Sequence, residues 1–174
     1  MLKRKPILFA LIYSLLVIAF KLFVFYNGLQ MTKLGMYSHI LSLILMTPFV
    51  FLLVFLLRKE IGGEISGKLA LKECLIFVSV AAVLLSVFNY VFFEKELNDY
   101  IISYIQTEGP KSIQEQAIKV GKPVTTIEID KMINEEIANL SAFKDTTSKL
   151  FSIIMFGIFS SFVTSIFLKR NPNG

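Results

Sequence analysis

The sequence predicts an all-α integral membrane protein with four transmembrane helices and a helical segment outside the membrane between the third and the fourth. Of its 174 residues, 55% are hydrophobic, and the mean hydropathy is +0.67. A soluble domain of this length could not bury so much apolar surface, so a lipid bilayer is the expected solvent. Two further observations support this class: the apolar residues gather in four long runs, and basic residues collect at the ends of those runs.

Each of the four apolar runs is long enough to cross about 30 Å of hydrocarbon, which requires about 20 helical residues. The runs cover residues 6–26, 36–57, 74–93 and 150–168. The basic start of the chain resembles that of a signal peptide, but its apolar part is long and no small-residue cleavage site follows. We therefore expect the first run to be a retained span, and the chain to form a single membrane domain with residues 94–149 as an insertion.

The distribution of basic residues predicts the orientation, because cytoplasmic loops are enriched in Lys and Arg. The N-terminus, the 58–73 connection and the C-terminus are basic, whereas the short 27–35 connection has only Lys33. Both termini are therefore expected in the cytoplasm, with the 94–149 segment on the outer side. That segment has ten acidic and seven basic residues, a net charge of −3.

The first half of the 94–149 segment is expected to continue the third span as a helix to about Gln106. Gly109 and Pro110 should end that helix, and a capping box at 112–115 should open a short helix that closes at Gly121 and Pro123. One face of the first helix is apolar. It carries Leu97, Tyr100, Ile101, Tyr104 and Ile105.

A second capping box, formed by Thr125 and Glu128, predicts a helix from Thr126 to about Phe143. The apolar face of this helix carries Ile129, Ile133, Ile137 and Leu140. Water makes exposed apolar area costly, at about 25 cal/mol per Å², so we expect this face to pack antiparallel against the 97–105 stripe. The chain should then bend around residues 144–148 into the fourth span.

Four polar residues near the outer ends of the spans form a candidate pocket. They are Lys21, His39, Asn89 and Glu94. Ionisable groups in lipid are costly, so they indicate a functional site by default. Simple interfacial anchoring is the favoured alternative, because Lys21 can extend to the interface and His39 can reach water.

Two further features concern the packing of the spans. Gly157, Ser161 and Ser165 recur at intervals of four, a spacing of small residues that allows helix backbones to approach closely in lipid. We favour packing within one chain over packing between copies, although a homo-oligomer remains an alternative. Pro48 removes one backbone donor in the second span and should kink it, with the Thr47 hydroxyl able to bond a freed carbonyl.

Residues that could carry catalysis are scarce. The chain has one cysteine, Cys74, and one histidine, His39, and it lacks HExxH and Gly-rich phosphate-loop motifs. The acidic residues of the 94–149 segment fit a solvated helix face. We expect no enzymatic activity, no metal and no cofactor. The basic residues are dispersed or lie at span ends, which argues against nucleic acid as a partner.

The four spans, the long segment between the third and fourth, the helical sequence IDKMINEEIANL and the ending IFLKRNP together resemble domain-of-unknown-function family 4199. The resemblance covers essentially the full chain. It implies a small multi-pass protein of the bacterial cytoplasmic (inner) membrane with a four-helix layout. It brings no catalytic or binding residues.

Two functions follow as hypotheses. The leading one is a non-catalytic membrane protein that binds a membrane or periplasmic protein through residues 94–149. The alternative is a small transporter or ligand-binding membrane protein that uses the candidate polar pocket. Inverted repeats are expected in many transporter folds, and none is visible here, which favours the first hypothesis.

Overall fold

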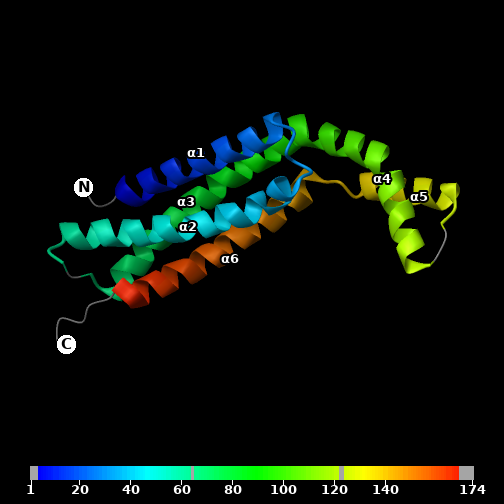
Figure 1. Ribbon diagram of the computed structural model, residues 1–174. Coiled ribbons are helices and arrows are strands. Elements are labelled where there is room, and N and C mark those ends of the chain that lie inside the picture. Colours follow the sequence, from blue (N-terminus) through cyan, green and yellow to red (C-terminus); the bar gives the residue numbers. More distant parts are fainter. Residues whose placement is uncertain (1–3, 64, 122–123, 169–174) are drawn as a thin grey trace. The chain divides into compact units, whose positions relative to one another are not determined.

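The computed structural model describes residues 4–63, 65–121 and 124–168, and the regular structure in these ranges is helical, without strands (Figure 1). The elements in chain order are α1 (Lys5–Tyr26), α2 (Lys33–Glu60), α3 (Gly67–Phe92), the π-helical turn η2 (Phe93–Leu97), α4 (Asn98–Val120), α5 (Thr126–Ala138) and α6 (Ala142–Leu168). The chain divides into two compact units. The four-helix unit comprises Met1–Phe88 with Ser148–Gly174, and the two-helix unit comprises Asn89–Thr147.

Four helices are long and apolar enough to cross a membrane: α1, α2, the helix that begins as α3, and α6. The predicted all-α class with four such helices is confirmed. Large apolar side chains remain exposed on each of them, for example Leu15, Phe51, Val83 and Phe159. Water would make this surface costly, whereas lipid covers it without loss, so the outside of the four-helix unit suits a bilayer.

The core of the four-helix unit is organised around Tyr13, which is fully buried. Its ring packs against the rings of Phe49 on α2 and Phe77 on α3, at centroid distances of 5.5 and 5.6 Å. Its hydroxyl donates a hydrogen bond of 2.9 Å to the backbone carbonyl of Ser42. A buried phenol needs such an acceptor, so one residue of α1 ties together three helices.

Pro48 lies inside α2, which runs without interruption from Lys33 to Glu60. The neighbouring Thr47 hydroxyl lies 3.4 Å from the hydroxyl of Ser160 on α6. Thr47 thus has a possible partner on α6, and the bond from its hydroxyl to a carbonyl of its own helix stays a prediction. The kink at Pro48 stays a prediction.

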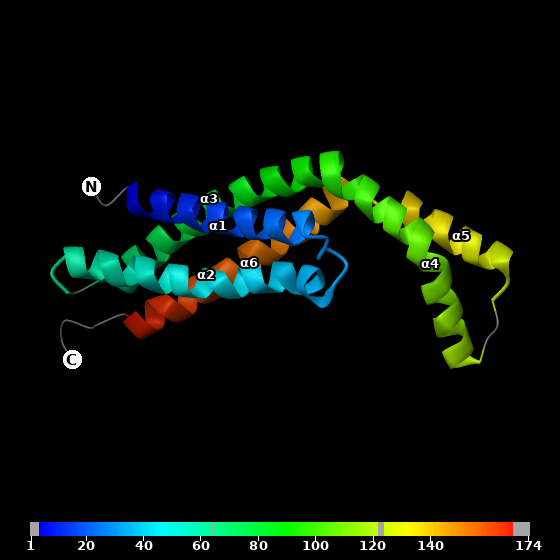
Figure 2. The same ribbon diagram turned by 45° about the horizontal axis from the view of Figure 1, so that its top comes forward.

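The helix that follows the third span extends further than predicted. Gly109 and Pro110 do not end it, and residues 112–115 do not open a new helix, because α4 runs from Asn98 to Val120. Proline removes one hydrogen bond and crowds the preceding turn, and Figures 1 and 2 show α4 changing direction along its length. Gly109 lies beside α5, because a Cβ added to it would meet Ile133 at an ordinary 3.6 Å. The predicted stop at Gly121 is confirmed, with φ at +70° in the left-handed region.

Helix α5 begins as predicted and ends early. The Thr125–Glu128 capping box is present: the Thr125 N–H donates to the Glu128 carboxylate at 2.8 Å, and the Glu128 N–H donates to the Thr125 hydroxyl at 3.4 Å. The helix stops at Ala138 rather than near Phe143. The Ser141 hydroxyl accepts a hydrogen bond from the Lys144 N–H at 3.3 Å, next to the start of α6 at Ala142. Residues 144–148 therefore belong to α6, and the bend expected there is wrong: the break lies between Ala138 and Ala142.

The two-helix unit has its own apolar core, which confirms that α4 packs against α5. Ile105 of α4 is buried with Ile129 and Ile133 of α5. Half-buried neighbours complete this core: Ile101, Ile113, Val124, Ile137 and Leu140. Part of the predicted stripe is wrong, because Tyr104 is 42% exposed and lines a shallow hollow with Tyr100 instead of facing α5. Because a tyrosine hydroxyl is well solvated by water, Tyr104 can lie at the surface at little cost.

Candidate functional site

The residues of the candidate polar pocket divide between the two units. Lys21 on α1 and His39 on α2 are half-buried in the four-helix unit. Asn89 at the end of α3 is buried, and Glu94 in η2 is exposed, both within the two-helix unit. The pocket that would combine all four stays a prediction, and so does interfacial anchoring.

The small residues of α6 lie inside the four-helix unit. Gly157, Ser161 and Ser165 are all buried. A Cβ added to Gly157 would lie 2.5 and 2.7 Å from the two methyl groups of Val78 on α3 and 3.2 Å from the sulfur of Met46 on α2. The serine hydroxyls donate back to their own helix, from Ser161 to the Gly157 carbonyl at 2.6 Å and from Ser165 to the Ser161 carbonyl at 2.7 Å. Glycine at 157 therefore permits a close contact, and the serines add small volume without an unsatisfied donor.

Cys74 lies in the same contact. It is fully buried on α3 and lies beside Ser161. A buried thiol among apolar side chains behaves as a small hydrophobic residue. This arrangement suits packing between α3 and α6 and offers a reactant no access.

Glu73 is the polar residue that the sequence reasoning missed. It is only 7% exposed, and its Oε2 has no hydrogen-bond partner among the described residues. It was overlooked because it directly precedes the 74–93 run and counted as part of a connection. Its spacing could have indicated burial, because Ala70 and Phe77 lie at positions i−3 and i+4 on the same helix face, and both are buried.

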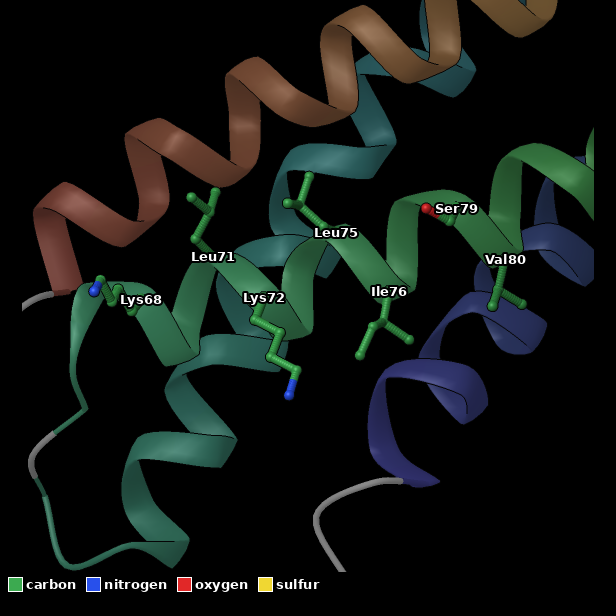
Figure 3. Close-up of a pocket in the computed structure, with 7 residues that line it drawn as sticks. All are labelled: Lys68, Leu71, Lys72, Leu75, Ile76, Ser79 and Val80. Carbon is green, nitrogen blue, oxygen red and sulfur yellow. The ribbon is translucent and has the colours of Figure 1, made fainter.

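A shallow groove runs along α3 near the same end of the four-helix unit (Figure 3). Two rows of side chains at intervals of four line it. One row is Lys68, Lys72, Ile76 and Val80, and the other is Leu71, Leu75 and Ser79. Figure 3 shows Lys72 and Ile76 projecting from one side of α3, whereas Leu71 and Leu75 project toward α6. The groove therefore combines a cationic end with an apolar length.

Two other cations of the described residues at this end have partners. Lys5 at the start of α1 forms an ion pair with Glu60 at the end of α2. The Arg58 Nε donates to the Gly63 carbonyl at 2.7 Å and so closes the turn that follows α2. These contacts use two of the cations and leave the lysines of the groove for another role.

The two-helix unit exposes large apolar side chains at the turn between α4 and α5. Ile118 near the end of α4 is 72% exposed, and Ile127 at the start of α5 is 81% exposed. The α4–α5 core uses the opposite sides of these helices, so neither isoleucine stabilises the unit by burial. They form a candidate contact surface, called here the apolar tip.

Within the described ranges, no three His, Cys, Asp or Glu side chains gather closely enough to hold a metal ion. The family model for a protein of unknown function (DUF4199) matches residues 7–170. Comparisons with curated proteins and with solved structures gave no match.

Proposed function

The chain belongs to DUF4199, a family of unknown function, and from its own residues we propose that it is a non-catalytic multi-pass protein of the bacterial cytoplasmic membrane whose two-helix unit binds a protein partner. The observation that carries this proposal is the apolar tip on a unit that already has its own core. Exposed apolar surface that does not stabilise the fold can serve as an interaction site. Ile118 and Ile127 flank the connection between α4 and α5, and each is exposed for contact with a partner.

The distribution of charge predicts on which side of the membrane the partner is found. Basic residues at the N-terminus, in the 58–73 connection and after α6 favour cytoplasmic termini. The two-helix unit then lies on the outer side, where a periplasmic or membrane protein is the available partner. A reporter active in the cytoplasm, fused after Arg170, should give signal, and one active only outside should work when inserted at Gly121. The reverse result at both positions would overturn this orientation.

The side chains that could perform chemistry support a non-catalytic role. Cys74 is fully buried, which suits packing rather than nucleophilic attack. His39 is the single histidine of the chain, so a His-based metal site or a histidine dyad cannot form within one copy.

The apolar tip can be tested with a photo-crosslinking amino acid placed at position 127 in native membranes. Glu136, an exposed polar residue of the same helix, supplies the matched control position. We expect one stoichiometric protein adduct from position 127 and none from 136, and an Ile118→Ser change should reduce that adduct. Equal labelling from both positions, or adducts with lipid alone at 127, would refute partner binding through this surface.

A further inference from the structure

The groove on α3 has the polarity of a phospholipid. Lys68 and Lys72 lie in the first two turns of the helix, and the side chains beyond them are apolar apart from Ser79. We propose that the groove binds an anionic phospholipid, with the headgroup phosphate at the two lysines and one acyl chain along α3. This site belongs to the four-helix unit and does not depend on the partner proposed for the two-helix unit.

The length of the groove fits one leaflet. From Lys72 to Val80 the helix rises about 12 Å, at 1.5 Å per residue. One leaflet contributes about 15 Å of hydrocarbon, half of the bilayer core. A phosphate held at Lys72 therefore leaves an acyl chain that runs beside Ile76 and reaches Val80 without leaving its own leaflet.

The charges of the groove are available to a ligand. Lys68 and Lys72 are both exposed, and neither has a carboxylate partner among the described residues. Lys5, in contrast, pairs with Glu60. The N-terminus of α3 at Gly67 adds partial positive charge at the same end of the helix. Two lysines one helical turn apart in sequence and a helix N-terminus together attract a phosphodiester.

The apolar row distinguishes a lipid from a free anion. Inorganic phosphate would use the lysines alone and leave Leu75, Ile76 and Val80 without a role. Ile76 and Val80 follow Lys72 at intervals of four, so apolar side chains lie directly beyond the charge, which matches a headgroup and tail joined in one molecule. The surrounding bilayer supplies that molecule at high local concentration.

Native mass spectrometry of the detergent-solubilised chain can count bound lipids. The probes are phosphatidylglycerol and phosphatidylcholine with the same acyl chains, added to the wild type and to Lys72→Gln and Lys68→Gln/Lys72→Gln variants. We expect the dissociation constant for phosphatidylglycerol to rise about fivefold for each lysine removed and that for phosphatidylcholine to stay unchanged. Lys59→Gln is the matched control, because Lys59 is an exposed lysine in the last turn of α2, outside the groove.

Two outcomes would overturn the headgroup site: an equal loss for Lys59→Gln and Lys72→Gln, or equal binding of the two lipids. The acyl chain has its own test. A Ser79→Phe change fills the groove, whereas Val83→Phe adds the same ring one turn further along α3. Phosphatidylglycerol binding should fall several-fold only for Ser79→Phe. Equal effects of the two changes, or displacement of the lipid by inorganic phosphate, would show that the groove does not hold the chain.

Discussion

A Gly157→Ala substitution tests the close contact between α6 and α3. The added Cβ would lie 2.5 Å from one methyl of Val78, whereas carbon atoms in good contact lie about 3.5–4.0 Å apart. About 1 Å of movement is therefore required. Val78 is buried and β-branched, so its side chain cannot rotate away freely. Met46, 3.2 Å from the new atom through its sulfur, can adjust more easily.

The expected free energy is the difference between two terms. Overpacking a core by a methyl group costs about 1–3 kcal/mol. Replacing glycine by alanine inside a helix returns about 1 kcal/mol. The net loss should be about 1 kcal/mol. Removing the obstacle changes the sign: in a Val78→Ala background, the two methyl groups of Val78 are gone, and Gly157→Ala should then stabilise the protein.

The single cysteine provides the assay. Cys74 is fully buried in this same contact, so a maleimide modifies it only when the bundle opens. Labelling across an SDS titration from mild detergent micelles gives the free energy of opening for each variant. Phe159→Ala, at an exposed and lipid-suited position of α6, should change it little. The close-contact reasoning fails if Gly157→Ala has the same sign with and without Val78.

Three further predictions concern other contacts. Ser161→Leu, at a position with no exposed surface, should destabilise the bundle by at least as much as Gly157→Ala in the same labelling assay. Thr125→Ala should cost about 1 kcal/mol of cap stabilisation, measured as faster amide exchange at the start of α5. Hydrogen bonds from the Thr125 N–H and hydroxyl hold the pKa of Glu128 below its ordinary value of 4.5. The stabilisation by the Glu128 carboxylate is therefore fully present above pH 4.5 and is lost as the pH falls through the lowered pKa. Amide exchange there should rise in acid, and a flat profile in the wild type would contradict the cap. If Lys21 and Glu94 are paired, reversing both charges should restore part of what either reversal loses, whereas additive losses would leave interfacial anchoring as the explanation.

The sequence alone determined the features that depend on short segments or on the bilayer. The four long apolar helices follow from run length, because hydrocarbon thickness sets how many residues a span needs. The capping box at Thr125 and Glu128 and the left-handed stop at Gly121 follow from local hydrogen bonding and backbone freedom. Each involves residues only a few positions apart, so no knowledge of distant neighbours was needed.

Tertiary contacts decided the features on which the sequence reasoning was wrong or silent. Pro110 would break an isolated helix, but α5 packs beside Gly109 and α4 continues to Val120. Ile105 packs in the α4–α5 core and Tyr104 does not. Helical periodicity placed both on one apolar face, and the position of α5 decides which of them is buried. The burial of Glu73 has the same origin. In sequence it lies beside an apolar run and suggests a connection, whereas in the structure it shares the buried face of α3 with Ala70 and Phe77.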